Sequence, residues 1–179
     1  DFFNSSQNNV LSTLKVFDWA RKLSVPVVYA SSSAVYGESP EGDDASDVTD
    51  LLSPYAVDKL IMEQYAAMAW GLYGVPSLGL RFFNVYGPRQ DPNSPYSGVI
   101  SVFVKRVSCE QPVTVNGGHQ TRDFVYVKDA VRIAVSSMDI LGRKPTCERV
   151  NVCTGSTITI SALLDVVVDI IGKIPSVVN

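Results

Sequence analysis

Segments of strand and helix character alternate along most of this 179-residue chain, and that alternation limits the fold more than any other feature. Short apolar runs bounded by turn residues indicate strands, and apolar residues at intervals of three and four indicate helices. Strands are expected at 25–30, 77–83, 113–115, 122–127 and 149–153, helices at 6–23, 54–73, 99–109, 128–141 and 161–171, and irregular segments at 37–54 and 84–98. Strands that alternate with helices usually pair in parallel, so we predict an α/β fold with helices on both faces of a parallel sheet.

The first expected strand, Val25–Ala30, runs directly into three serines, Ser31, Ser32 and Ser33. In open α/β sheets, ligands bind beyond the carboxyl ends of the strands. The three hydroxyl groups therefore lie where a binding or catalytic site is expected.

Tyr55 and Lys59 lie four residues apart near the start of the second expected helix, about twenty residues after the serines. Side chains at this spacing project from the same helix face. A lysine ammonium favours the phenolate form of a neighbouring tyrosine, and a serine hydroxyl can relay a proton to a substrate alcohol. The pair therefore indicates proton removal from an alcohol. The alternative is a half-buried aromatic ring beside a solvated charge, since this spacing also occurs by chance.

The composition excludes several other functions. The chain is 46% hydrophobic and 18% charged with a net charge of −3, which gives no electrostatic reason to expect nucleic acid or an anionic membrane as a partner. No apolar segment reaches the roughly 20 residues of a membrane span. The three cysteines form no C-x-x-C pattern and the chain has one histidine, so we expect free thiols, a cytoplasmic location and no bound metal.

A dinucleotide-binding sheet needs a glycine-rich loop between its first strand and helix, and this chain has none. Gly71 and Gly74 have a different spacing and lie at a helix end. The chain also opens on an expected helix rather than a strand. Two explanations stay open from the residues alone: a dinucleotide enzyme seen without its first part, or a different class of protein.

Five segments, in order, resemble the extended short-chain dehydrogenase/reductase family, and specifically its nucleotide-sugar 4-epimerases. These segments are Asn9–Thr13 (with Ser12 where the family pattern has glycine), Val28–Gly37, Ser53–Lys59, Leu80–Gln90 and Arg122–Val127. The resemblance implies a partial Rossmann-like sheet followed by part of a small substrate-binding subdomain. It also implies that the chain is an internal part of a longer protein, and that it would not bind NAD measurably on its own.

The same resemblance implies roles for residues around the proposed proton chemistry. Tyr55 would be the catalytic base, Lys59 its partner, and Ser32 the hydroxyl relay, with Ser31 or Ser33 as alternatives. Asn9 matches a catalytic asparagine, although helix capping or packing explains it equally well. The implied cofactor is NAD, and its expected contacts are Ser31, Tyr55, Lys59 and Phe82.

The resemblance also implies residues that contact a UDP-sugar substrate. They are Ser32, Asn84, Arg89, Val99, Ile100 and Arg122. Arg122 would clamp the diphosphate, because a guanidinium group binds phosphate oxygens in pairs. A turn-forming asparagine, an exposed arginine and two core residues are the alternative interpretations of Asn84, Arg122, Val99 and Ile100.

The implied reaction is epimerisation at C4 of the sugar through a 4-keto intermediate. Dehydration is disfavoured, because related dehydratases carry an Asp-Glu pair where this chain has Ser33 and Ala34. A decarboxylase or a reductase stays open as an alternative, and so does a non-enzymatic binding or dimerisation module.

The expected organisation follows from the same resemblance. Residues 1–90 would form the catalytic half of the dinucleotide-binding domain, and 91–179 mostly the substrate-binding subdomain, with some elements returning to the main sheet. Helices 6–23 and 54–73 would pair with the same helices of a second copy to form a homodimer.

Overall fold

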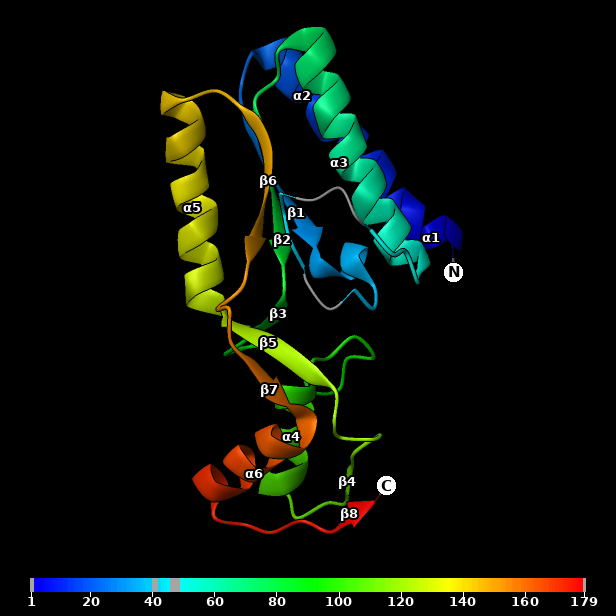
Figure 1. The fold of residues 1–179 in the computed structure, drawn as a ribbon, viewed down its shortest axis with the longest axis vertical. Helices are drawn as coiled ribbons and strands as arrows, with labels where there is room; N and C mark the ends of the chain where they lie inside the picture. Colours follow the sequence, from blue (N-terminus) through cyan, green and yellow to red (C-terminus); the bar gives the residue numbers. More distant parts are fainter. Residues whose placement is uncertain (1, 40–41, 46–48, 179) are drawn as a thin grey trace. The chain divides into compact units, whose positions relative to one another are not determined.

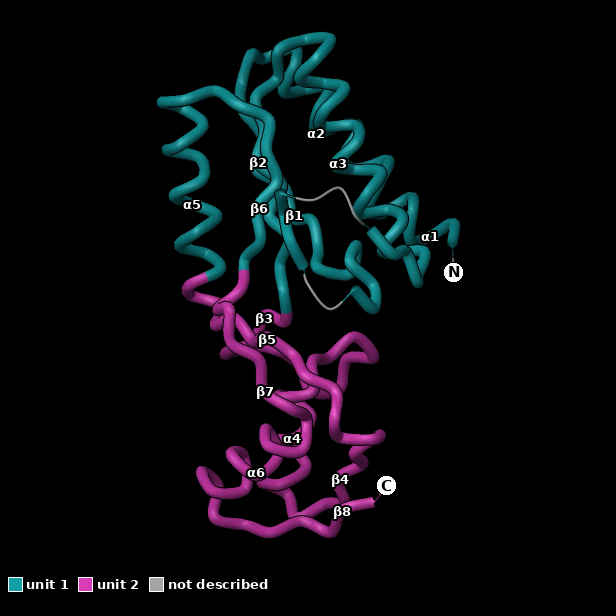
Figure 2. Tube along the Cα trace, in the orientation of Figure 1, with its two compact units in different colours: residues 1–83, 130–152 teal, residues 84–129, 153–179 magenta. Residues whose placement is uncertain are grey.

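A computed structural model describes residues 2–39, 42–45 and 49–178, and the chain divides into two compact units (Figures 1 and 2). Unit 1 contains residues 1–83 and 130–152, and unit 2 contains residues 84–129 and 153–179. The chain therefore leaves unit 1, returns to it for one helix and one strand, and leaves it again.

Unit 1 is a parallel three-stranded sheet with helices on both faces, as the alternation predicts (Figure 1). Its elements are α1 (Phe2–Ser6), the π-helical segment η1 (Gln7–Leu11), α2 (Ser12–Leu23), β1 (Val27–Ser32), the 3₁₀ turn η2 (Ser33–Tyr36), α3 (Pro54–Tyr73), β2 (Ser77–Phe82), α5 (Val127–Arg143, from Ala130 onward) and β6 (Cys147–Val152). The strand order is β1-β2-β6. Helices α2 and α3 lie on one face, and α5 lies on the other.

Two boundaries in unit 1 differ from the expectation. The first helix begins at Phe2 rather than Ser6, and its middle is π-helical. Strand β1 covers 27–32 rather than 25–30, so Ser31 and Ser32 belong to the strand itself. The strand continues through these polar residues because its backbone pairs with β2, with Ser31 opposite Arg81 and Ser32 opposite Phe82.

Helix α3 follows its sequence signals closely. The Ser53 hydroxyl accepts a hydrogen bond from the Ala56 amide and caps the amino end, and Pro54 occupies the first turn. Gly74 ends the helix with a φ of 66°, a left-handed conformation that glycine adopts readily. The core beneath α2 and α3 consists of Phe17, Ala20, Val27, Ala66, Ala69 and Val75.

Unit 2 is built from two helices and five short strands among its described residues (Figure 2). Its elements are β3 (Asn84–Tyr86), α4 (Val99–Ser108), β4 (Val113–Thr114), β5 (Thr121–Tyr126), β7 (Thr157–Thr159), α6 (Ile160–Ile171) and β8 (Val177–Val178). Strand β5 pairs with β3 in parallel and with β7 in antiparallel fashion. Its core consists of Phe103, Val107, Val113, Val115, Ile160, Leu163, Leu164 and Val167.

Three of the strands in unit 2 differ from the expectation. Residues 84–86 form β3 within a segment expected to be irregular, and β7 and β8 were not expected. These strands are two or three residues long, and their partners lie far away in the sequence. Such pairings leave no periodic pattern from which they could be predicted.

Candidate functional site

Ser32 lies at the carboxyl end of β1, where the sheet topology predicts a site. Its hydroxyl oxygen accepts a hydrogen bond from the Ala34 amide at 3.1 Å, which caps the 3₁₀ turn that follows. This bond uses a lone pair and leaves the hydroxyl proton available for donation. Phe82 ends β2 directly opposite Ser32 in the strand register, and its side chain is half-buried.

The first two turns of α3 bring Tyr55 and Lys59 together. The Lys59 ammonium lies 5.4 Å from the centroid of the Tyr55 ring, and it donates a hydrogen bond of 2.8 Å to the Ala30 carbonyl oxygen. Tyr55 is 43% exposed, whereas Lys59 is 7% exposed. The predicted pair therefore forms, and Lys59 is not the solvated charge of the alternative interpretation.

Burial of Lys59 changes its proton affinity. Loss of solvation lowers the pKa of its ammonium group, and the nearby Asp58 carboxylate offsets part of this effect. Asp58 itself is buried and accepts hydrogen bonds from the hydroxyls of Ser5 and Ser6, which ties α1 to α3 beside Lys59.

Asn9 lies in η1, the π-helical segment between α1 and α2. Its amide donates to the Ser5 carbonyl oxygen at 3.0 Å, so in this structure its side chain binds its own helix. Single π-helical turns within α-helices frequently occur at functional sites. The hydrogen bond from the Asn9 side chain fits the packing interpretation of this residue. The π-helical turn is compatible with the catalytic interpretation.

Ser31 points into the interior of unit 1, toward α3. It is 2% exposed, and its hydroxyl donates a hydrogen bond of 2.5 Å to Glu63 on α3. Glu63 in turn binds Arg81 of β2. The sequence reasoning missed Glu63 and Arg81. The one local signal for Glu63 is that it lies one helical turn after Lys59, on the same face of α3.

A separate cavity of about 320 Å³ lies within unit 2 and contains two of the predicted substrate residues, Asn84 and Arg122. It is lined by Asn84, Val99, Phe103, Thr114, Val115, Asn116, Gln120, Arg122 and Ile160. The Asn84 amide donates to the Asp123 carbonyl oxygen at 3.0 Å, and the Arg122 guanidinium donates to the Thr121 carbonyl oxygen at 2.7 Å. Arg122 is exposed, so much of its guanidinium group stays available to a ligand.

The remaining predicted substrate residues divide between cavity, core and surface. Val99 lines the cavity, whereas Ile100 packs against the core of unit 2 and does not line it. Arg89 is exposed, has a φ of 73° and is not among the lining residues. Polar lining residues that the sequence reasoning missed are Thr114, Asn116 and Gln120. For Thr114 and Asn116, the available signal was their alternation with Val113 and Val115 just before a glycine turn.

Asp123 is a buried residue next to Arg122 that anchors the same region. It is 4% exposed, and its carboxylate accepts hydrogen bonds from the backbone amides of Thr154 and Gly155 at 2.8–3.0 Å. Buried carboxylates are costly unless they are bonded in this way. Asp123 therefore fixes the loop after β6 to β5, next to Arg122.

Comparison with known proteins agrees with this arrangement. Residues 4–153 match the model of the NAD dependent epimerase/dehydratase family. The chain belongs to this family. The resemblance stated from the sequence motifs is thereby confirmed, and so is NAD as the cofactor of the family.

Several members of the family resemble the chain closely. A UDP-glucuronate 4-epimerase of Thermodesulfobacterium geofontis is 32% identical over 170 residues, which is 93% of this chain and 50% of that protein. The UDP-N-acetylglucosamine 4-epimerase of Methanobrevibacter ruminantium, solved with UDP-N-acetylmuramic acid, superposes with a TM-score of 0.89 at 34% identity and covers 97% of this chain and 56% of its own. The UDP-glucose 4-epimerase of Thermus thermophilus, solved with NAD, gives 0.80 at 34% identity, with 95% and 56% covered.

These matches confirm the α/β fold of Rossmann type. The chain spans about half the length of the curated epimerase/dehydratase relatives that it matches. Among the described residues, no helix is long and apolar enough to cross a membrane.

Proposed function

We propose that the full-length protein is an NAD-dependent epimerase that inverts C4 of a UDP-sugar through a 4-keto intermediate. The observation that carries this proposal is the buried Lys59 ammonium, held between the Tyr55 ring and the strand that ends in Ser32. Family membership supports the reaction class. The identity of the sugar, whether a hexose, an N-acetylhexosamine or a uronic acid, is left to experiment.

In this proposal, Tyr55 removes the proton from the sugar hydroxyl and later returns it. The Lys59 ammonium lies 5.4 Å from the centroid of the Tyr55 ring, close enough to interact electrostatically with charge on that side chain during the reaction. The Ser32 hydroxyl donates to the sugar oxygen while its own oxygen stays bound to the Ala34 amide. Asn9 is proposed to assist the reaction from η1, which follows the helix whose Ser6 donates a hydrogen bond to Asp58 of α3. A positioned acid–base group of this kind contributes roughly 10²–10⁴-fold to the rate.

The residues at the carboxyl ends of the unit 1 strands, together with Lys59, suit the binding of one part of NAD. When bound, NAD accepts a hydride from the sugar carbon and returns it. Lys59 has three ammonium donors, and among the described residues one is used by the Ala30 carbonyl, which leaves donors for ribose hydroxyls. Phe82, and Ser31 through its backbone, lie at the strand ends where the ring of the cofactor would be held. Activity is proposed for the full-length protein, because this chain contains no glycine-rich phosphate loop.

The cavity of unit 2 suits the nucleotide portion of the substrate. Arg122 offers an exposed guanidinium for the diphosphate, Asn84 an amide, and Val99 an apolar wall. Ile100 supports Val99 from the core, and Arg89 is proposed to bind phosphate from the surface of its loop. A cytoplasmic location is proposed with this function, in line with the free thiols expected from the cysteine pattern of the sequence.

Replacement of Tyr55 tests the proposal. In the full-length protein, Tyr55→Phe keeps the ring beside Lys59 but removes the hydroxyl, so we expect turnover to fall by roughly 10³-fold or more. Binding of UDP, measured by calorimetry, should change less than threefold. Turnover within threefold of the unsubstituted protein would exclude Tyr55 as the base.

Product analysis separates epimerisation from the other reactions of the family. The sugar nucleotide should keep its mass and change only in the configuration at C4, which nuclear magnetic resonance reports. Loss of carbon dioxide would identify a decarboxylase, and gain of two hydrogens a reductase.

A further inference from the structure

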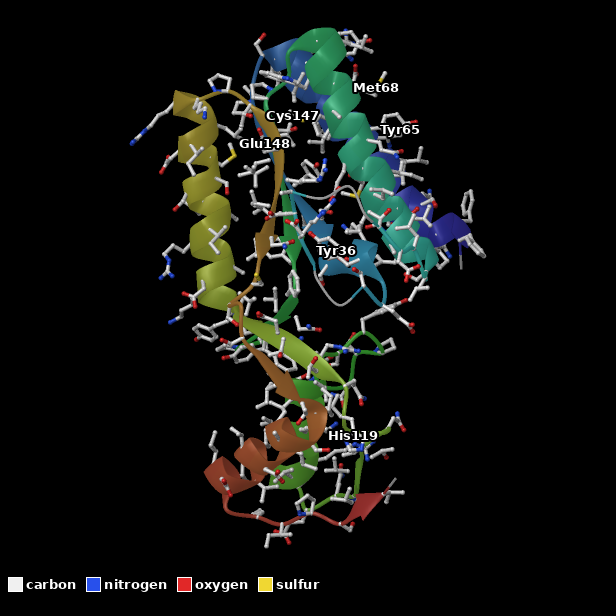
Figure 3. All side chains as sticks on the ribbon, viewed as in Figure 1. Tyr36, Tyr65, Met68, His119, Cys147 and Glu148 are labelled. Atoms are coloured by element: carbon white, nitrogen blue, oxygen red, sulfur yellow. The ribbon has the colours of Figure 1, made fainter. Side chains whose placement is uncertain are left out.

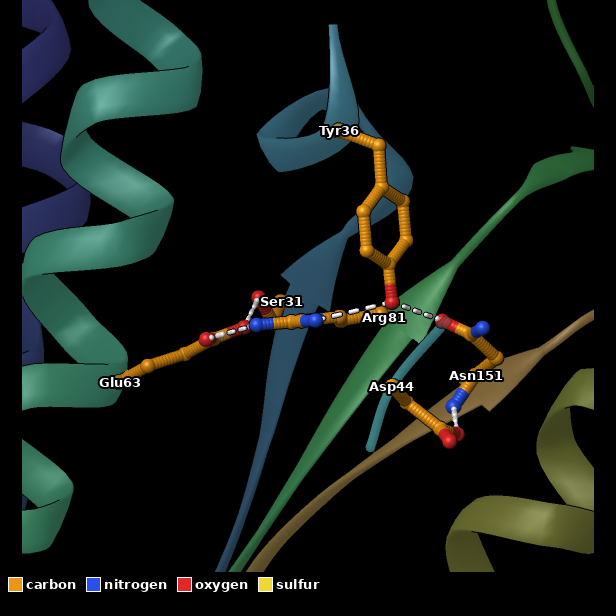
Figure 4. A network of polar contacts seen from close by, with 6 residues as sticks. All are labelled: Ser31, Tyr36, Asp44, Glu63, Arg81 and Asn151. Carbon is orange, nitrogen blue, oxygen red and sulfur yellow. Dashed lines mark hydrogen bonds and ion pairs between the residues drawn. The ribbon is translucent and has the colours of Figure 1, made fainter. Parts of the chain in front are cut away.

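A buried polar network runs across the three strands of the unit 1 sheet and reaches α3 at Glu63, one helical turn after Lys59 (Figure 4). The Arg81 guanidinium binds both carboxylate oxygens of Glu63, at 2.8 and 2.6 Å, and donates to the Tyr36 hydroxyl at 2.8 Å. Ser31 donates to Glu63, and Tyr36 donates to the Asn151 side-chain oxygen at 2.7 Å. Ser31, Glu63, Arg81 and Tyr36 are each 7% exposed or less.

The three strand members of this network stand at one level of the sheet. Ser31 of β1 pairs with Arg81 of β2, and Arg81 pairs with Asn151 of β6 in the parallel register. Side chains of paired residues project from the same face of a sheet. The row therefore ties β1, β2 and β6 together one residue before β1 ends at Ser32.

Helix α3 is joined to β1 at two consecutive strand residues, the second of which belongs to this row. Lys59 donates to the carbonyl of Ala30, and Glu63, one turn later, accepts from the hydroxyl of Ser31. Two bonds from successive turns to successive strand residues fix both the rotation and the sliding of α3 against β1. Tyr55 lies one turn before this pair of bonds, and Ser32 lies one residue after them.

Stability alone does not explain an ion pair at this depth. Replacing a buried ion pair by apolar residues of similar volume is often neutral or stabilising, because two charges must lose their hydration. Burial alone would lower the pKa of Arg81, but hydrogen bonds to Glu63 and Tyr36 more than offset this, so the pKa is raised. What the network adds over an apolar core is a preferred orientation of the elements, since each hydrogen bond is strong only when its donor and acceptor are aligned.

We propose that Glu63 and Arg81 are positioning residues for the acid–base pair, with Ser31 and Tyr36 as their connections to the strand and the following turn. The inference rests on the proposed function, because it concerns the geometry between Tyr55 on α3 and Ser32 on β1. Neither residue touches the reacting atoms. Their network holds the helix that carries the base at a fixed position on the strand that carries the relay.

Glu63→Gln in the full-length protein is the first test. Glutamine keeps the shape and an acceptor for Ser31, but it cannot neutralise Arg81. We expect kcat to fall 10- to 100-fold, while the affinity for UDP and the NAD content per protomer stay within threefold. A purely structural role would lower the folded fraction and the binding capacity together, and would leave the turnover of each folded molecule unchanged.

The matched control is Glu110→Gln, which breaks an exposed ion pair with Lys173 in unit 2. It applies the same chemical change to a salt bridge with 44% and 70% exposed side chains, and kcat should stay within twofold.

Two other changes decide the matter if Glu63→Gln fails to fold. Tyr36→Phe removes only the hydroxyl between Arg81 and Asn151, and it should lower kcat three- to tenfold with UDP affinity unchanged. The double substitution Glu63→Met and Arg81→Met removes both charges and should fold, yet lose at least tenfold in kcat. A folded double variant, or Tyr36→Phe, with kcat within twofold of normal would overturn the inference. Loss of turnover in these variants without loss in Tyr55→Phe would instead reject the proposed function.

Discussion

Lys59 shows how one buried cation can serve chemistry at the expense of stability. Its ammonium is almost fully removed from water, and its one hydrogen bond among the described residues goes to a backbone carbonyl. Desolvation lowers its pKa, so protonation favours the unfolded chain relative to the folded one. The folded protein therefore tolerates this charge as part of the arrangement around Tyr55.

This tolerance predicts a dependence of stability on pH. Below the lowered pKa of Lys59, the folded and the unfolded chain both hold the proton, and the cost of burying the ammonium is complete. As the pH rises through that pKa toward the ordinary value of 10.5, the folded chain releases its proton first and becomes more stable relative to the unfolded chain. The free energy of unfolding of the unsubstituted protein should thus rise with pH in this window relative to Lys59→Met.

Urea unfolding at several pH values up to about 10.5 measures this difference, with Lys173→Met as the control for methionine at an exposed lysine position. A difference that stays constant across the window would contradict the lowered pKa of Lys59.

At the residue scale, the sequence allowed part of this site to be predicted. Tyr55 and Lys59 could be paired because helical spacing alone brings them onto one face. Glu63 and Arg81 could not, because they lie 18 positions apart on different elements and charged residues are normally exposed. Only the register between β1 and β2 reveals that Arg81 stands opposite Ser31.

At the element scale, α3 is the part of the structure whose limits follow most directly from local chemistry. Ser53, Pro54 and Gly74 mark its two ends as their side chains and backbone preferences predict. The ends of β1 were placed less well, because its pairing with β2 extends the strand through two serines that have no apolar pattern. The π-helical segment was missed, since nothing in its composition separates it from an α-helix.

Two glycines at the end of α3 give a matched test of backbone conformation. Gly74 has a φ of 66° with no atom near the position of an added methyl group, so Gly74→Ala should lower the free energy of unfolding by about 1 kcal/mol through backbone strain alone. Gly71 lies inside the helix with equal open space, and Gly71→Ala should raise it by about 0.5–1 kcal/mol.

Denaturant titration of the two variants under identical conditions checks the opposite signs. Equal changes in the same direction would mean that neither glycine is chosen for its conformation.

At the scale of the whole molecule, the outer face of α2 and α3 is unusually apolar for a surface. Trp19, Leu23, Met68 and Leu72 are 56–70% exposed, and a cavity of about 310 Å³ lies between the two helices. In Figure 3 the side chains of Tyr65 and Met68 project from α3 away from the sheet. Several large apolar side chains exposed on two neighbouring helices are typical of an interaction site. It supports the proposal that a homodimer forms through these helices.

Leu72→Asp tests this surface in the full-length protein. A charge placed in a paired apolar face loses its hydration, so the variant should sediment as a monomer at concentrations where the unsubstituted protein is a dimer. Ile170→Asp on α6, which is 79% exposed, is the control and should leave the dimer intact. An unsubstituted protein that remains monomeric at tens of micromolar would reject the proposed dimer.

The whole-molecule arrangement was predictable only in part. The order of strands and helices gave the α/β class, and the order of motifs gave the family. The return of α5 and β6 to unit 1 depends on which strand β6 chooses as its partner. That choice is a non-local pairing, and no local pattern specifies it.

The polar row of Ser31, Arg81 and Asn151 also bears on how the sheet assembles. Parallel strands rich in apolar residues can pair out of alignment at little cost, and a slip by one residue turns every side chain to the opposite face. A slip of β2 would move the Arg81 charge to the face that α5 covers and separate it from Glu63 (Figure 1). An unpaired buried charge is among the costliest defects in a protein interior. The network therefore penalises misaligned sheets during folding, before any substrate is present to benefit from the alignment.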